Sequence, residues 1–223
     1  MQQPLAPNVV DDFQFWGLQI IEHAQFAAMG LEDQPELLAQ ALEIHRQLVA
    51  AYSARDLATF RAIVEQQFIP FKDAALAQLK AGTWLGWNFQ SLLRHMIDEE
   101  QFFLDRTGAR TMTPEQEMAF WLKERLEETE LSAHLVDPTE GGAVGKLTQA
   151  ANALAQLGQR CLTTCDARVV QAAQTLGLRM GAELAAMQPG RPQSVIPAEL
   201  KTHVERENAR FVQAATRILL TGR

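Results

Sequence analysis

Two stretches of this sequence place a histidine and a glutamate one helical turn apart. His95 precedes Glu99 by four residues, and His203 precedes Glu207 by the same spacing. Residues four apart lie on one face of an α-helix, so each pair would present an imidazole and a carboxylate to the same point. Such a pair can chelate a metal ion, and two pairs could hold two ions. The spacing predicts metal binding but does not identify a substrate.

A phenylalanine follows each pair after one more turn, at Phe103 and at Phe211. These phenylalanines predict that the face carrying each pair continues into the core. A single His–Glu pair on a helix is often a solvated surface pair, and two matching copies make that interpretation weaker. Buried carboxylates are costly without a cation. In the alternative without a metal ion, the positive charge beside these carboxylates comes from Arg94 and Arg206, which adjoin the two pairs.

Two doublets of possible ligands on other expected helices can add to the site. Glu22–His23 lies in the first helix, and Glu127–Glu128 lies in the fifth. Adjacent residues point about 100° apart on a helix, so both members of a doublet cannot reach one centre. His23 lies two turns after Trp16 on its face, and Glu128 has the same relation to the next Phe-Trp pair. The predicted metal ligands are His95, Glu99, His203, Glu207, His23 and Glu128, with Glu22 and Glu127 as second-layer residues or alternates.

These donors suit iron or manganese, and zinc is an alternative. Helical bundles hold metal pairs with a Glu-x-x-His motif, whereas here histidine comes first and the spacing is four. Iron or manganese at such a site would allow an oxidoreductase acting with O₂ or peroxide. The alternatives are a non-catalytic metal-binding protein and a structural or partner-binding helical protein. No catalytic residue and no organic cofactor site is identified.

The charge balance excludes several partner classes. The 223 residues carry a net charge of −7, and their Lys and Arg are scattered. Nucleic acid and anionic membranes attract clustered basic residues, so neither is expected as a partner. Residues 1–10 are polar and proline-punctuated, unlike a signal peptide, which favours a cytoplasmic protein. The expected partners are a metal ion and an unidentified small molecule, and a homo-oligomer remains an option.

The chain has two cysteines, Cys161 and Cys165. Because they lie four apart in an expected helix, the favoured interpretation is a pair of small buried apolar residues. A redox or metal pair is the alternative. A structural disulfide within one helical turn is disfavoured by geometry.

Apolar periodicity predicts an all-α protein with two tandem four-helix repeats. The Phe15-Trp16 pair of the first helix returns as Phe120-Trp121 in the fifth, and the His–Glu pairs fall on the fourth and eighth. The expected repeats are residues 1–110 and 111–223, packed as one globular unit in which helices one, four, five and eight meet. Pro70 is expected to kink or split the third helix. The expected helices are 11–30, 35–53, 57–81 with Asp56 as its cap, 84–106, 114–135, 143–164, 167–187 and 198–220.

Together these motifs resemble an uncharacterised bacterial family of duplicated, ferritin-like helical proteins. The resemblance rests on Phe15-Trp16, on Glu22-His23-Ala24 followed by Phe26, and on the two His-x-x-x-Glu segments. In the second repeat it includes Phe120-Trp121 and residues 135–140. The sequence departs from the family at Glu128, where the family tends to have histidine. The resemblance implies a ferritin-like all-α bundle and a metal site, and it implies no known reaction.

Overall fold

The computed structural model describes residues 7–31, 34–83, 88–108, 112–136, 141–186 and 198–221. The chain divides into two compact units, Met1–Thr111 and Met112–Arg223. Within the described ranges the secondary structure is helical, so the all-α prediction is confirmed. The sequence-based boundary lay after residue 110. The expected meeting of helices from the two repeats, and the ferritin-like assignment, stay predictions.

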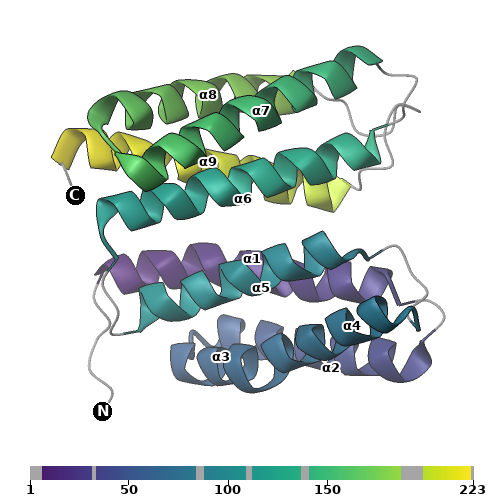
Figure 1. Cartoon of the computed structure of the whole chain (residues 1–223). Coiled ribbons are helices and arrows are strands. Elements are labelled where there is room, and N and C mark those ends of the chain that lie inside the picture. The colour runs from purple at the N-terminus through teal and green to yellow at the C-terminus, as the bar shows by residue number, and fades with distance from the viewer. Residues whose placement is uncertain are drawn as a thin grey trace. The chain divides into compact units, whose positions relative to one another are not determined.

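The first unit is a four-helix arrangement in which the third helix is segmented (Figure 1). Its first helix packs against the second and the last, the second packs against the third, and the segment after Pro70 packs against the last. This topology lays the helix that contains His23 beside the helix that contains His95 and Glu99. The elements are α1 (Pro7–Met29), α2 (Pro35–Ser53), α3 (Leu57–Ile63), the π-helical turn η1 (Val64–Phe68), α4 (Ile69–Ala81) and α5 (Gln90–Thr107).

Pro70 explains the segmented helix, as predicted. A proline has no N–H to donate, and its ring collides with the preceding turn of an α-helix. The chain widens into η1 directly before it, where the Ile69 N–H donates to the Val64 carbonyl five residues back. The π-helical turn accommodates the ring without ending the helical path. Consequently α4 keeps its contact with α5.

The last helix of the first unit begins later than the expected residue 84. Residues 84–87, including Trp84 and Trp87, lie outside the described residues. Phe89 is extended, and α5 starts at Gln90. The Asn88 side chain donates to the Ala27 carbonyl near the end of α1 at 2.9 Å. That carbonyl is among the last of α1, which a helix leaves without internal partners, so Asn88 serves as a cap and not as the next helical residue.

The second unit repeats this topology with unbroken helices. The first helix packs against the second and the fourth, and the third packs against both of those (Figure 1). At the start, the Thr113 and Gln116 side chains each accept a hydrogen bond from the other residue's backbone N–H, which is the predicted capping box. The expected start signal at residues 137–140 and the loop at 189–197 lie outside the described residues. The helices are α6 (Pro114–Leu135), α7 (Gly141–Thr163), α8 (Ala167–Ala186) and α9 (Ala198–Thr221).

Both repeats bury the phenylalanine that follows each His–Glu pair. Phe103 and Phe211 are fully buried, which confirms that the faces of the two His–Glu pairs continue into a core. In the first unit Phe103 packs edge-on against Phe60, and Trp16 packs edge-on against Phe102. These contacts fix the rotation of α5 about its axis. Among the described helices, none combines the length and the apolarity that a membrane crossing needs.

The cysteine prediction is wrong. Cys161 and Cys165 form a disulfide, and their Cα atoms lie 3.9 Å apart. Cys161 lies in α7, which ends at Thr163, and Cys165 lies two residues beyond that end. The backbone at Cys165 is therefore not part of the helix, and the chain can turn back towards Cys161 there. The geometric objection to a disulfide holds within a helical turn and not at a helix end.

The close approach of α2 to α1 at Gly17 predicts opposite effects for two glycine substitutions. A Cβ at Gly17 would lie 2.6 Å from the ring of Tyr52, whereas a Cβ at Gly158 in α7 would meet nothing within 4 Å. Gly17→Ala should lower the free energy of unfolding by about 1–3 kcal/mol through overpacking. Gly158→Ala should raise it by about 0.5–1 kcal/mol through helix propensity. Urea denaturation measures both, and a stabilising Gly17→Ala would contradict the packing.

Candidate metal centre

In the first unit, one carboxylate lies between two imidazoles. The Glu99 Oε2 atom is 3.0 Å from Nε2 of His23 and 3.6 Å from Nε2 of His95. All three side chains are buried, with exposed fractions of 0%, 1% and 5% respectively. Of the candidates proposed from the first repeat, His23, His95 and Glu99 are thus brought together. The contact between His23 and Glu99 joins α1 to α5.

The distances suit a metal ion. Nitrogen and carboxylate ligands lie about 2.0–2.2 Å from zinc, so neighbouring ligand atoms around one such ion are roughly 3–4 Å apart. His23 and His95 each share with Glu99 a set of possible ligand atoms that lie within 4.8 Å of one another, and the two histidines belong to different sets. Two imidazoles and one carboxylate form the donor set that iron(II) uses at sites with open coordination positions. The donor types and the two distances from Glu99 therefore fit a divalent cation of this class.

A second carboxylate orients His23 from the other side of its ring. The Glu100 Oε1 atom lies 3.5 Å from Nδ1 of His23, while Nε2 of the same ring faces Glu99. Glu99 and Glu100 are adjacent, so they leave α5 in directions about 100° apart. A carboxylate on one nitrogen of a histidine sets the ring orientation and the tautomer, and so prepares the other nitrogen to bind metal.

Glu100 is itself held by Lys72 of α4. The ammonium group forms an ion pair with Oε1 of Glu100, and both side chains have no exposed surface. The Lys72 Nζ atom also lies 3.9 Å from the centre of the Phe68 ring. Complete burial lowers the pKa of Lys72 from its ordinary value, against the opposing effect of the Glu100 carboxylate. The structure thus joins Lys72, Glu100, His23 and Glu99 in one buried chain of charged and polar groups.

Sequence reasoning missed Lys72 and Glu100. Lys72 lies one turn after Phe68 and one turn before Leu76, on an apolar stripe, and a lysine there usually extends its ammonium to solvent. Its neighbour Phe71 and the nearby Pro70 were the available signal that this part of α4 is enclosed. Glu100 was visible as the second member of a Glu–Glu doublet beside a predicted ligand.

In the second unit the corresponding pair forms within one helix. Nε2 of His203 lies 3.1 Å from Oε1 of Glu207, and both side chains are buried. Glu128 of α6 is also buried, but it forms an ion pair with Arg125 one turn earlier on the same helix. The Arg125 guanidinium also donates to the Val204 carbonyl of α9 at 3.5 Å. Arg125 therefore supplies the positive charge for Glu128 that a metal would supply to a ligand.

The alternate ligands, and the arginines proposed in place of a metal ion, lie outside this group of buried side chains. Glu22 is half-buried, and Glu127, also half-buried, pairs with Lys123 at 3.0 Å. Arg94 is exposed and Arg206 is half-buried. The cations that pair with Glu100 and Glu128 are instead Lys72 in the first unit and Arg125 in the second, neither of which was proposed from the sequence.

Comparisons with known proteins support the fold and leave the chemistry open. No family model matches the sequence. An uncharacterized protein of Acanthamoeba polyphaga mimivirus is 28% identical over 158 residues, which cover 60% of this chain and 49% of that protein. The chain therefore spans about half the length of that relative. The crystal structure of an uncharacterized protein from Bacillus cereus aligns with a TM-score of 0.83 and 12% identity, over 97% of this chain and 92% of the other. At that identity the match shows the fold alone.

The buried pair of Lys72 and Glu100 predicts a strongly asymmetric response to mutation. Lys72→Met should lower the free energy of unfolding by about 3–5 kcal/mol, because it leaves the Glu100 carboxylate buried without its cation. The double variant Lys72→Met with Glu100→Gln should recover part of this loss. Lys80→Met on the exposed side of α4 is the control and should change stability by less than about 0.5 kcal/mol. Equal losses for Lys72→Met and Lys80→Met in urea denaturation would refute the pairing.

Proposed function

We propose that this protein binds a divalent metal ion through His23, His95 and Glu99 of the first unit. The observation that carries the proposal is the buried carboxylate oxygen of Glu99 within 3.6 Å of both imidazole Nε2 atoms. Each group would bind in the state that metal binding requires, as a neutral imidazole or an ionised carboxylate. Lys72 supplies a single positive charge to this buried region, which holds two carboxylates. A divalent cation would stabilise the other one.

Iron or manganese is the ion we expect. Carboxylate and imidazole together suit both, and no thiolate is needed. Zinc binds similar donors and is the competing ion. The order His-x-x-x-Glu differs from the Glu-x-x-His of paired-metal bundles. Three ligands leave positions for substrate or water, so the assignment is to an open site.

The surrounding residues have separate tasks at this site. The Glu100 carboxylate faces Nδ1 of His23 at 3.5 Å and would keep Nε2 directed at Glu99. Lys72 holds Glu100, so that this carboxylate does not itself turn towards the ion. Burial of all these groups excludes bulk water, which strengthens each electrostatic contact. These residues would thus bind the ion, orient the His23 ligand and shield the site from bulk water.

The proposed activity is that of an oxidoreductase acting with O₂ or peroxide. Iron(II) or manganese(II) at an open site would supply redox chemistry and a binding position for a small oxidant. The competing function is metal binding without turnover. Oxygen consumption by the iron-loaded protein, compared with the His23→Ala variant, separates the two. Consumption equal to that of the variant would leave a non-catalytic metal-binding protein.

Metal content tests the site itself. We expect purified protein, loaded with iron(II) or manganese(II) and desalted, to retain metal by elemental analysis. His23→Ala and His95→Ala should lose it, because each removes a ligand. Glu100→Gln should retain the ligands but weaken affinity by about 10–100-fold, since it alters the orientation of His23. His134→Ala is the control, because His134 is exposed on α6.

Two outcomes would overturn this assignment. Unchanged metal content in both His23→Ala and His95→Ala would reject the site in the first unit. Loss of metal in His203→Ala alone would move the site to the His203–Glu207 pair of the second unit. Circular dichroism of each variant would show whether the helices are intact.

A further inference from the structure

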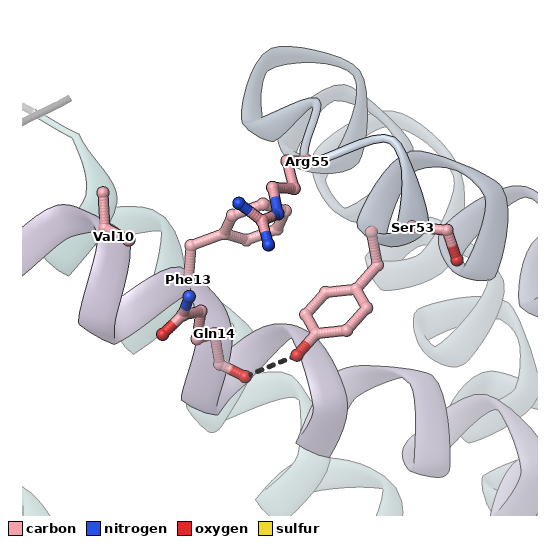
Figure 2. A pocket seen from close by; sticks show the side chains of 6 residues that line it. Val10, Phe13, Gln14, Ser53 and Arg55 are labelled. Carbon is pink, nitrogen blue, oxygen red and sulfur yellow. Dashed lines mark hydrogen bonds between the residues drawn. The ribbon is translucent and has the colours of Figure 1, made fainter. Parts of the chain in front are cut away.

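A pocket lies on the first unit between α1 and α2, apart from the buried histidines. It has a volume of about 650 Å³. The described residues that line it are Val10, Phe13 and Gln14 of α1, Tyr52 and Ser53 of α2, and Arg55 of the turn that follows (Figure 2). Small-molecule sites have volumes of this order and combine apolar walls with a few polar groups. The pocket has both.

The aromatic wall of the pocket is held in place by three contacts of Tyr52. Its ring lies against the backbone of α1 at Gly17, where a Cβ would be only 2.6 Å away. The ring meets Phe13 edge-on, with the ring centres 5.6 Å apart. The hydroxyl donates to the Gln14 carbonyl at 3.0 Å, the bond drawn in Figure 2. Because the wall is fixed before any ligand arrives, binding would cost little ordering.

Arg55 brings a positive charge to this wall. Its backbone is left-handed, with φ of 55°, at the position after a helix where glycine is usual. The Asp56 N–H donates to the Ala51 carbonyl across this turn, which locks it. In Figure 2 the guanidinium extends back towards Phe13 of α1. Within the described part of the chain, the guanidinium forms no hydrogen bond or ion pair with another residue, and the neighbouring Asp56 carboxylate caps α3 through Thr59.

We infer that this pocket binds a small carboxylate with an aromatic or branched apolar body. The apolar part would lie against Phe13, Tyr52 and Val10. The carboxylate would meet the fork of donors on Arg55, which matches carboxylate geometry in a bidentate pair. The Gln14 side chain at the same opening offers a further amide donor.

Phenylacetate is a suitable probe, and Tyr52 provides the signal. Tyr52 is the only tyrosine in the sequence, so protein labelled at the ε positions of its tyrosine ring gives an NMR signal from this one residue at the pocket wall. Titration with phenylacetate should shift this resonance to saturation. Phenylethanol, which lacks the carboxylate, should bind about tenfold more weakly or worse, because it cannot form the charged hydrogen bonds to Arg55.

Two substitutions of Arg55 keep the test independent of folding. Arg55→Gly removes the guanidinium while it suits the left-handed backbone, so its Tm should equal or exceed that of the parent chain. Arg55→Gln removes the charge and keeps a side chain. Both should weaken phenylacetate binding about tenfold or more, and Arg46→Gln, an exposed arginine of α2 outside the pocket, should not. Absence of a saturable shift, equal binding of phenylethanol, or unchanged affinity in both Arg55 variants would overturn the inference.

Discussion

Two adjacent carboxylates buried in α5, Glu99 and Glu100, are the constraint on which the first unit depends. Each would destabilise the fold if it were left without positive charge or donors in the interior. Glu100 pairs with Lys72 of α4, and Glu99 lies against the imidazoles of His23 and His95. The two carboxylates thereby join three helices. A core built in this way specifies the rotation of each helix more sharply than apolar contacts alone, and it also assembles a set of metal donors.

The second unit also buries carboxylates, and it pairs them with different residues. Glu128 of α6 stands where His23 stands in α1, but Arg125 of the same helix neutralises it. Arg125 in turn occupies the place of Ile20, an apolar core residue of the first unit. His203 and Glu207 keep their contact within one turn of α9. The two repeats thus share a topology and differ in chemistry. The first brings histidines from two helices to one carboxylate, whereas the second pairs a carboxylate with a guanidinium.

Much of the fold could be predicted from the sequence, because helices carry local signals. The Thr113–Gln116 capping box, the interruption at Pro70 and the burial of Phe103 all follow from short-range patterns. The pairing of His23 with Glu99 was accessible only through the assumption that their helices are neighbours. Lys72 was missed because these local signals do not show whether its ammonium reaches solvent, which depends on how α5 packs against α4. The disulfide was missed because both cysteines were treated as parts of one helix, whereas Cys165 lies beyond the end of α7 at Thr163.

The most direct test of the account is X-ray absorption spectroscopy at the metal edge of the iron- or manganese-loaded protein, compared with the same measurement on the His23→Ala variant. The account predicts a first shell of nitrogen and oxygen at about 2.0–2.2 Å with the outer-shell scattering of imidazole rings, weakened when His23 is replaced. A first shell without imidazole scattering, or a spectrum unchanged by His23→Ala, would contradict it.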